Sequence, residues 1–231
     1  MTTSLSAAAQ QFIQSVLDQQ PRLAVFDCDG TLWKADSGER FFRWEMERGL
    51  VSPAVAAKLT ARYKLYESGE VSEDDMCGEM VTMHEGIPVM EIERAIDEFF
   101  PAVIAPGIFP EMQALTHGLK ASGCEMWAIS STNDWVVRRG VRDFGIPADH
   151  VIAACVHCHD GHATGNLIRV PSGEGKAVAV REIIKRTPDM AFGNSRWDQA
   201  MLELARTPYA INPNPDLATI ARTRGWTIYQ P

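Results

Sequence analysis

Short apolar runs alternate with helical patterns along most of the chain. An amphipathic helix comes first, followed by a run at 23–26 that is apolar throughout and bounded by polar and turn residues, the pattern of a strand buried in a parallel sheet. Similar runs recur at 126–129, 151–154, 190–192 and 209–211, and helical patterns lie between them at 109–121, 134–144 and 175–186. Strands that alternate with helices predict an open, doubly wound α/β fold around a parallel sheet.

The stretch from 36 to 100 breaks this alternation. It contains no convincing strand pattern, and its helical segments lie at 39–48, 53–67, 72–83 and 88–99. Because this insertion directly follows the first strand, it predicts a cap over the carboxyl ends of the sheet, where ligands bind in such folds. We therefore expect an α/β catalytic core formed by residues 1–35 and 106–231, with an α-helical cap domain formed by residues 36–105. The alternative is a helical subdomain that only adds stability.

Composition and charge narrow the class of protein. The 231 residues are 45% hydrophobic, enough for a sizeable core, and the formal net charge of -8 argues against a nucleic-acid partner while leaving room for a small anionic ligand. No apolar stretch approaches the ~20 residues needed to cross a bilayer, and the first residues lack the basic start of a secretory signal. An odd number of cysteines, five, suits a reducing compartment. We expect a cytoplasmic protein without a membrane partner, and the oligomeric state is left open.

Two acidic residues follow the first predicted strand, Asp27 at its end and Asp29 in the turn. A single carboxylate there is commonly a helix cap or a turn residue, but an acid pair followed by Gly-Thr-Leu indicates chemistry. Mutual repulsion in a partly desolvated loop favours one neutral and one ionised group, as nucleophilic and acid–base catalysis require. A bound divalent cation would relieve that repulsion. The backbone amides of Gly30 and Thr31 are placed to face a phosphate group.

The sequence Asp-Cys-Asp-Gly-Thr-Leu at 27–32 resembles the first motif of the haloacid dehalogenase superfamily, specifically of its phosphatases. The resemblance implies a Rossmann-like core in which Asp27 attacks phosphorus to form an aspartyl-phosphate. It also implies that Asp29 acts as the general acid and then as the general base. The second acid favours a phosphatase, because dehalogenase members characteristically lack it.

Two further motifs of this family have counterparts. The apolar run at 126–129 ends in Ser130, which the resemblance makes a donor to a phosphate oxygen, with Ser131 as the second choice. An ordinary polar turn is the alternative. Lys176, at a predicted helix start, matches the lysine that offsets phosphate and carboxylate charge in the family. For a lysine considered alone, a solvated side chain is the commoner explanation.

The fourth motif departs from the family at one position. The apolar run at 190–192 is followed by Gly193 and Asn194, with Asp198 further on, whereas the family usually has a magnesium-binding aspartate where Asn194 stands. The resemblance implies Mg²⁺ held by the Asp27 carboxylate, the Asp29 backbone carbonyl and Asn194, with Asp198 in or near the shell. An amide oxygen can bind a hard cation but supplies less charge, so we expect a lower magnesium affinity.

The order of the motifs and the cap between the first two resemble the phosphoserine-phosphatase-like branch. In that branch a cap glutamate binds the substrate amine; Glu39 is the nearest match and Asp36 is its rival, while a solvated helix acid is the alternative for either. A cap arginine binds the substrate carboxylate, but the corresponding position at 77–79 holds none. Arg62 and Lys64, in the preceding helical segment, are the remaining basic candidates.

The predicted activity is hydrolysis of a small phosphorylated metabolite, a phosphomonoester. Phosphoserine is not favoured, because its carboxylate lacks the expected arginine, and an amine-bearing ester without a carboxylate suits an acidic cap better. One alternative is a phosphotransferase that passes the phosphoryl group to an alcohol. The other is a catalytically weakened protein that binds a phosphorylated ligand. The departure from the family pattern at Asn194 is the reason to consider it.

A stretch rich in cysteine and histidine, at 155–162, is the remaining candidate site. In a strand, alternation would put Cys155, His157 and His159 on one face and Cys158 on the other, which is poor geometry for a tetrahedral zinc. The Asp-Gly pair at 160–161 is a hairpin signal, so a β-ribbon is the preferred interpretation. Cys28, between the two acids, is expected to point away from the site and to pack.

Overall fold

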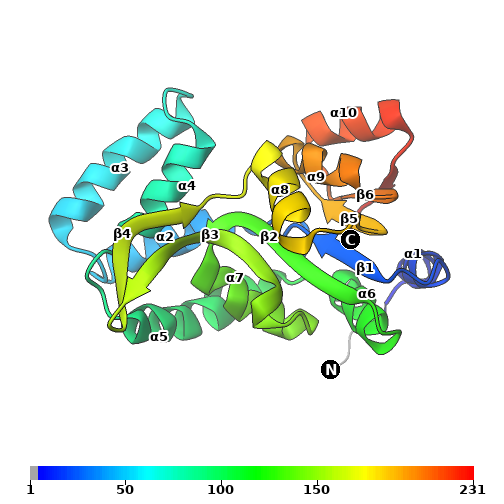
Figure 1. Ribbon diagram of the computed structural model, residues 1–231, viewed down its shortest axis with the longest axis horizontal. Helices are drawn as coiled ribbons and strands as arrows, with labels where there is room; N and C mark the ends of the chain where they lie inside the picture. Colours follow the sequence, from blue (N-terminus) through cyan, green and yellow to red (C-terminus); the bar gives the residue numbers. More distant parts are fainter. Residues whose placement is uncertain (1–4) are drawn as a thin grey trace.

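The centre of the protein is a seven-stranded sheet in the order β4-β3-β2-β1-β5-β6-β7 (Figure 1). The computed structural model describes residues 5–231, so residues 1–4 of the predicted core segment 1–35 lie outside the described part. Neighbouring strands are parallel except for β3 and β4, which are antiparallel. The strands are Leu23–Phe26 (β1), Glu125–Asn133 (β2), Val151–His159 (β3), His162–Arg169 (β4), Met190–Gly193 (β5), Thr207–Ile211 (β6) and Thr227–Tyr229 (β7).

Helices cover both faces of this sheet (Figure 1). Helices α1, α6 and α7 contribute to one hydrophobic layer, and α8, α9 and α10 contribute to the opposite one. The α-helices are Ala7–Leu17 (α1), Ser37–Glu47 (α2), Pro53–Glu67 (α3), Glu73–Thr82 (α4), Val89–Phe99 (α5), Pro110–Ala121 (α6), Asp134–Val141 (α7), Glu174–Ala179 (α8), Gln199–Leu204 (α9) and Pro215–Arg224 (α10). The doubly wound α/β fold predicted from the alternation of runs is confirmed.

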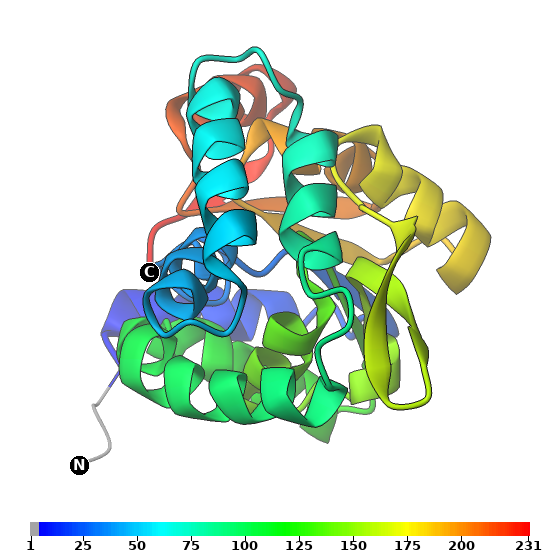
Figure 2. The ribbon, with the colours of Figure 1, turned by 90° about the vertical axis from the view of Figure 1, so that its left-hand side faces the viewer.

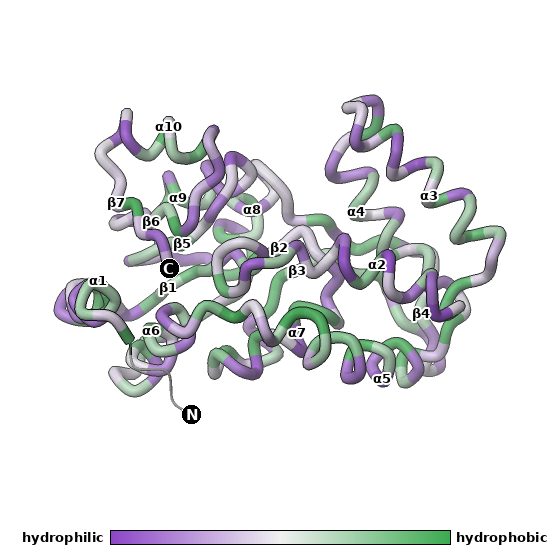
Figure 3. The backbone as a smooth tube through the Cα atoms, turned by 180° about the vertical axis from the view of Figure 1, so that it is seen from behind, coloured by the Kyte–Doolittle hydropathy of each residue, from purple (hydrophilic) through white to green (hydrophobic). Residues whose placement is uncertain are grey.

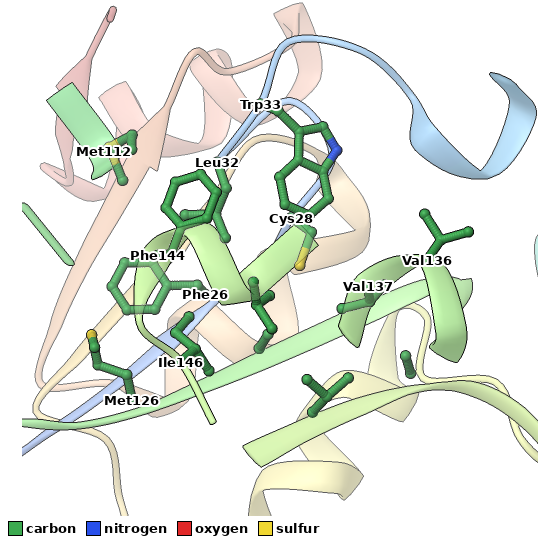
Figure 4. Close-up of a cluster of buried hydrophobic side chains, with 14 of the residues drawn as sticks. Phe26, Cys28, Leu32, Trp33, Met112, Met126, Val136, Val137, Phe144 and Ile146 are labelled. Atoms are coloured by element: carbon green, nitrogen blue, oxygen red, sulfur yellow. The ribbon is translucent and has the colours of Figure 1, made fainter. Parts of the chain in front are cut away.

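Strand β1 lies at the middle of the sheet and is buried on both sides. Its residues Ala24 and Phe26 belong to the larger hydrophobic cluster, whereas Leu23 and Val25 belong to the cluster on the other face. Figure 4 shows the larger cluster around Phe26, with Cys28 packed inside it as expected. Figure 3 shows β1 as apolar along its length. A strand buried in this way presents the residues after its carboxyl end at the edge of the sheet, where ligands bind.

The segment between β1 and β2 is helical, and its helices pack in two groups. Helices α3 and α4 stand side by side (Figure 2) and share a small cluster with α2 that includes Phe42, Leu59 and Met76. Helix α5 instead packs against α7, and its residues Ile92 and Ile96 belong to the larger cluster of the core. The division into a core and a cap domain at 36–105 stays a prediction.

Strands β3 and β4 form a long hairpin that reaches the α2–α5 segment. Its turn, Asp160 and Gly161, has φ values of 47° and 75°, and the β-ribbon interpretation is confirmed. The hairpin contacts α4 so closely that a Cβ added at Gly78 would lie 3.2 Å from a methyl carbon of Leu167. Within residues 5–231, no group of three or more His, Cys, Asp or Glu side chains is arranged to hold a metal ion.

Several elements extend beyond their apolar runs. Strand β2 continues to Asn133, beyond its apolar run, so its last residues are polar. Its register against β3 is irregular after Ser130. Strand β7 and helix α10 have no counterpart among the predicted elements. Of the helices described in residues 5–231, none has the length and apolar character needed to cross a membrane.

Candidate active site

The site forms where β1, β2 and β5, neighbours in the sheet, reach their carboxyl ends. Asp27 directly follows β1, Ser130 lies near the carboxyl end of β2, and Asn194 directly follows β5. Gly30, in the loop after β1, has φ +75°, and a Cβ there would lie 1.9 Å from Asn194 Nδ2. Only glycine therefore lets the loop adopt this conformation and lets the Asn194 side chain approach it so closely.

Lys176, from α8, stands between two buried carboxylates. Its Nζ donates hydrogen bonds to Asp27 Oδ1 at 2.7 Å and to Asp198 Oδ1 at 2.5 Å. Burial and the nearby Asp198 charge raise the pKa of Asp27 to about 7, although Lys176 acts in the opposite direction. Burial alone would lower the pKa of Lys176, but the Asp198 and Asp27 carboxylates outweigh it and raise that pKa. The ammonium group is therefore held charged beside Asp27.

Asp198 is fully buried and both of its carboxylate oxygens are engaged. Oδ1 accepts from Lys176, and Oδ2 accepts from the backbone N–H groups of Asn194 and Ser195, each at 2.9 Å. These bonds fix the loop after β5 and orient Lys176. The other oxygen of Asp27, Oδ2, accepts from the buried hydroxyl of Thr31 at 2.8 Å.

Asp29 is held by three side chains from different parts of the chain. Its Oδ1 accepts from Trp33 Nε1 at 2.6 Å and from the Ser37 hydroxyl at 2.6 Å, and its Oδ2 accepts from Thr132 Oγ1 at 2.6 Å. The backbone N–H of Ser37 adds a fourth bond at 2.7 Å. These four hydrogen bonds fix the orientation of the Asp29 carboxyl group beside Asp27.

A cavity of about 350 Å³ lies over these residues. It is lined by most of the residues singled out in the sequence, whereas Thr31 and Asp198 do not line it and instead form hydrogen bonds with Asp27 and Lys176. The predicted residues on its wall are Asp27, Asp29, Gly30, Glu39, Ser130, Ser131, Lys176 and Asn194.

The two serines after the β2 run face different partners. Ser130 is buried, and its hydroxyl oxygen accepts from the Thr132 backbone N–H at 3.1 Å, which leaves its own proton available to a ligand. Ser131 Oγ donates instead to Glu73 Oε1 on α4, at 3.3 Å. Glu73 Oε1 also accepts from Ser172 Oγ at 3.1 Å, so this one residue joins α4 to the segments that carry Ser130 and Lys176.

Sequence reasoning missed Glu73, as well as the three residues that hold Asp29. Trp33, Thr132 and Ser37 lie next to predicted motifs, but which carboxylate they contact depends on how the chain folds back. Glu73 follows the Gly-Glu-Val-Ser segment at 69–72, and nothing in that segment indicates a contact with Ser172, 99 positions away.

The α2–α4 side of the cavity is acidic and aromatic. Burial raises the pKa of Glu73, against the effect of the hydroxyls that donate to it. The two candidates for the substrate amine, Glu39 and Asp36, both line the cavity. Glu39 accepts a hydrogen bond from Arg43 Nε at 2.9 Å, and Asp36 caps α2 by accepting from the Glu39 backbone N–H at 2.8 Å. The acidic and aromatic residues on this side are Asp36, Glu39, Glu45, Glu73, Phe41, Phe42, Tyr63 and Tyr66.

No arginine reaches this cavity within the described chain. Arg62 forms hydrogen bonds to both carboxylate oxygens of Glu79, at 2.5 to 3.0 Å, and neither Arg62 nor Lys64 lines the cavity. Lys34 and Lys176 are the basic residues on its wall. Neither Arg62 nor Lys64 therefore takes the place of the cap arginine on this cavity wall.

The residues around Asp27 offer oxygen ligands of the kind that a hard cation takes. The Asp27 carboxylate, the Asp29 backbone carbonyl and the Asn194 amide belong to loops that meet at the same edge of the sheet, and Asp27 and Asn194 both line the cavity. The raised pKa of Asp27 marks a place where a nearby positive charge would be favourable. These residues fit Mg²⁺ as the resemblance implies.

Comparison with known proteins places the chain in a family. A model of the haloacid dehalogenase-like hydrolases matches residues 24–203. The chain belongs to this family of hydrolases.

Its relatives include named phosphatases. Histidinol-phosphatase from Neisseria meningitidis serogroup C (strain 8013) is 28% identical over 217 residues, which cover 89% of this chain and 97% of that protein. Phosphoserine phosphatase SerB1 from Mycobacterium tuberculosis (strain ATCC 25618 / H37Rv) is 29% identical over 228 residues, which cover 91% of this chain and 73% of that protein. The chain is accordingly an enzyme, a phosphatase of the haloacid dehalogenase type.

Solved structures agree with the fold. A protein of unknown function from Bordetella pertussis Tohama I matches with a TM-score of 0.79 and 28% identity, over 90% of this chain and 97% of that one. A phosphoserine phosphatase solved as a phospho-aspartyl intermediate analogue matches with a TM-score of 0.60 at 20% identity, over 90% and 92%. The resemblance to phosphoserine-phosphatase-like members is confirmed for the fold.

Proposed function

We propose that the protein is a Mg²⁺-dependent phosphatase that hydrolyses a small phosphomonoester through an aspartyl-phosphate on Asp27. An oxygen of the Asp27 carboxylate attacks phosphorus, and the ester P–O bond breaks. Ser130 and Lys176 hold the phosphoryl oxygens, since both line the cavity beside Asp27. Positioning and charge neutralisation supply most of the catalysis in such transfers.

Asp29 acts as the general acid and then as the general base. It gives its proton to the leaving alcohol oxygen, then takes one from the water that attacks the aspartyl-phosphate, which releases phosphate and restores the Asp27 carboxylate. Its bonds to Trp33, Ser37 and Thr132 support this role, because they fix the carboxyl group without placing a cation on it.

Mg²⁺ would be held by the Asp27 carboxylate, the Asp29 backbone carbonyl and Asn194. When bound, it supplies positive charge that keeps Asp27 ionised and offsets the charge of the phosphoryl oxygens. Asp198 has both carboxylate oxygens engaged by Lys176 and by backbone N–H groups, so we assign it to the edge of the shell. There it positions Lys176 and the Asn194 loop.

The observation that carries the choice of substrate is the acidic wall of the cavity. Carboxylates of Asp36, Glu39 and Glu73 line its α2–α4 side, and no arginine of the described chain does. A leaving group with a positive charge and no carboxylate complements such a wall. The substrate class is therefore a phosphorylated amino alcohol, and the named relative makes L-histidinol phosphate one candidate alongside phosphoethanolamine and phosphocholine.

A panel of esters tests this proposal. Magnesium-dependent phosphate release is measured for these three cationic esters, for phosphoserine and for glycerol 3-phosphate. We expect the best cationic ester to exceed phosphoserine in kcat/KM by about tenfold or more, since discrimination by one charged contact is of that order.

An aryl phosphate in the same panel separates the two parts of the proposal, because it measures the chemistry without a charged leaving group. If phosphoserine or glycerol 3-phosphate proves the best substrate, the assignment of a cationic leaving group is wrong. If magnesium elicits no phosphate release from any ester, the catalytic mechanism is wrong as well.

A further inference from the structure

Asn133 carries a buried hydrogen-bond donor without a partner. Its side chain is 7% exposed, and its Oδ1 accepts from the Trp135 backbone N–H at 3.0 Å, which defines the orientation of the amide. Its Nδ2 has no hydrogen-bond partner within residues 5–231. Folded proteins rarely leave a buried donor unpaired, because the lost hydration is not recovered. Asn133 also lines the active-site cavity, unlike Asp134 and Arg169, the other residues with unpaired buried side-chain atoms in this part of the chain.

The neighbours of Asn133 place it under the α2–α5 segment. Thr132 lies against α2, where a Cβ added at Gly38 would be 2.8 Å from Thr132 Oγ1. Trp135 packs its ring edge-on to His84, with ring centroids 5.6 Å apart. Asn133 therefore lies on the α2 and His84 side of the cavity, where the proposed function, with the phosphoryl group at Lys176 and Ser130, places the leaving group.

Glu45 offers an acceptor at the same end of the cavity. It is 1% exposed, and its Oε2 lies 2.7 Å from Nε2 of His84, the residue that contacts Trp135. His84 Nδ1 donates to the Val81 carbonyl at 3.0 Å, so the imidazole is held from both sides. Glu45 also lines the cavity, and Oε2 is its oxygen that contacts His84. The cavity wall thus presents the unpaired amide donor of Asn133 and the carboxyl group of Glu45.

We propose that Asn133 is a substrate-binding residue that donates a hydrogen bond to an acceptor on the leaving group, beside Glu45, which accepts from an N–H of the same group. An imidazole ring carries one acceptor nitrogen and one N–H in a flat frame, and Phe41 and Phe42 supply aromatic surface on the same cavity wall. The substrate class is then a phosphorylated amino alcohol with a nitrogen heterocycle. This inference rests on the proposed function, because it assigns the part of the substrate that leaves with the alcohol oxygen.

The test compares two amine-bearing esters in one variant. Asn133→Asp keeps an oxygen acceptor for the Trp135 N–H, so α7 stays capped, but it replaces the unpaired donor by an acceptor. We expect the ratio of kcat/KM for L-histidinol phosphate to kcat/KM for phosphoethanolamine to fall about tenfold or more, since only the first ester offers a ring acceptor. Asn166→Asp, the same change on the exposed part of β4, should leave this ratio at the wild-type value. The dissociation constant of L-histidinol, measured by calorimetry, should rise by a similar factor in Asn133→Asp alone.

Each outcome decides the matter. A ratio that is unchanged in Asn133→Asp, or an equal fall for both esters, overturns the inference, because it assigns Asn133 to structure or to the phosphoryl group. A wild-type preference for phosphoethanolamine overturns it as well. If no ester is hydrolysed but L-histidinol binding depends on Asn133, the proposed function fails while this inference stands; if binding does not depend on Asn133 either, both fail.

Discussion

At the scale of single residues, the charges around Lys176 determine how much negative charge is available to bind a cation. Its ammonium group lies between Asp27 and Asp198, and Asp198 is itself fixed by the backbone of the Asn194 loop. Asn194 adds no charge of its own, so the cation site that we propose has one carboxylate fewer than the family pattern implies. This balance makes the magnesium requirement the property that should respond most clearly to a change at position 194.

Asn194→Asp should therefore lower the magnesium concentration that gives half-maximal activity, by a factor on the order of ten, because a carboxylate binds a hard cation more strongly than an amide oxygen. The side chain keeps its size, so its close contact with Gly30 is preserved. The measurement is a magnesium titration of phosphate release from an aryl phosphate, with Asn166→Asp as the surface control. An unchanged or higher magnesium requirement in Asn194→Asp would remove position 194 from the metal site.

Some of these residues could be predicted from the sequence and others could not. Asp27, Asp29 and Lys176 stand in short motifs whose order along the chain is itself informative, and the structure brings Asp27 and Lys176 into contact. The role of each stays a prediction. Thr132 lies 103 positions from Asp29, and no local pattern indicates that its hydroxyl donates to that carboxylate. The unpaired amide of Asn133 is likewise visible only once its neighbours are placed.

At the scale of elements, helix α4 is joined to the catalytic loops by its first residue. Glu73 accepts hydrogen bonds from Ser131, which follows Ser130 in β2, and from Ser172, in the segment before Lys176. Tyr66 of α3 donates to its other oxygen at 3.4 Å. The start of α4 is thus a point where the helical segment docks on the phosphate-binding loops.

Glu73→Ala should loosen this docking by roughly 1–3 kcal/mol, because it removes a charged acceptor from three hydroxyl groups. Hydrogen exchange of the backbone amides near 131 and 172 should become faster in this variant. Glu73→Gln, which keeps an oxygen acceptor, should show a smaller change. Asp74→Ala, at the exposed next position of the same helix, is the matched control. Equal exchange rates in Glu73→Ala and Asp74→Ala would contradict a docking role.

Helix boundaries were within reach of sequence reasoning, but packing partners were not. The caps Ser52 and Ser72, with Pro53 in the first turn, mark the starts of α3 and α4 to within a residue of the prediction. That α5 packs on α7 follows from a long-range contact that periodicity does not encode. Strand β7 is only three residues long and half-polar, so it leaves almost no pattern to detect.

At the scale of the whole molecule, the core and the helical segment share one hydrophobic cluster. Phe41 of α2 and Ile96 of α5 belong to the same cluster as Phe26 of β1. The buried pair Glu45–His84 contacts this cluster through Phe41, which stacks on the His84 ring with centroids 6.4 Å apart. The protonation of that pair is therefore linked to the stability of the entire fold.

Stability should depend on pH through this pair. Burial raises the pKa of Glu45 above its ordinary 4.5, and although burial alone would lower the pKa of His84, Glu45 raises it above 6.5. Both shifts mean that the folded state binds more protons than the unfolded chain. The stabilisation that the protonated pair contributes is therefore fully present below about pH 4.5, and it is lost as pH rises through the folded pKa of His84.

Denaturant unfolding at a series of pH values measures this effect, with the double variant Glu45→Gln and His84→Gln as the non-titrating reference. The free energy of unfolding of the wild type, minus that of the reference, should decrease as pH rises from about 5 to about 8. A difference that increases over this interval would contradict the assignment.

The central claim is that Asp27 becomes phosphorylated during turnover. The most direct measurement is mass spectrometry of peptides from the enzyme quenched with acid during hydrolysis of an aryl phosphate in the presence of magnesium. We predict a single phosphoryl group on the peptide that contains Asp27, and its loss, together with all magnesium-dependent phosphate release, in Asp27→Asn. Undiminished phosphate release by Asp27→Asn, or a phosphoryl group found on another residue during turnover, would contradict the account.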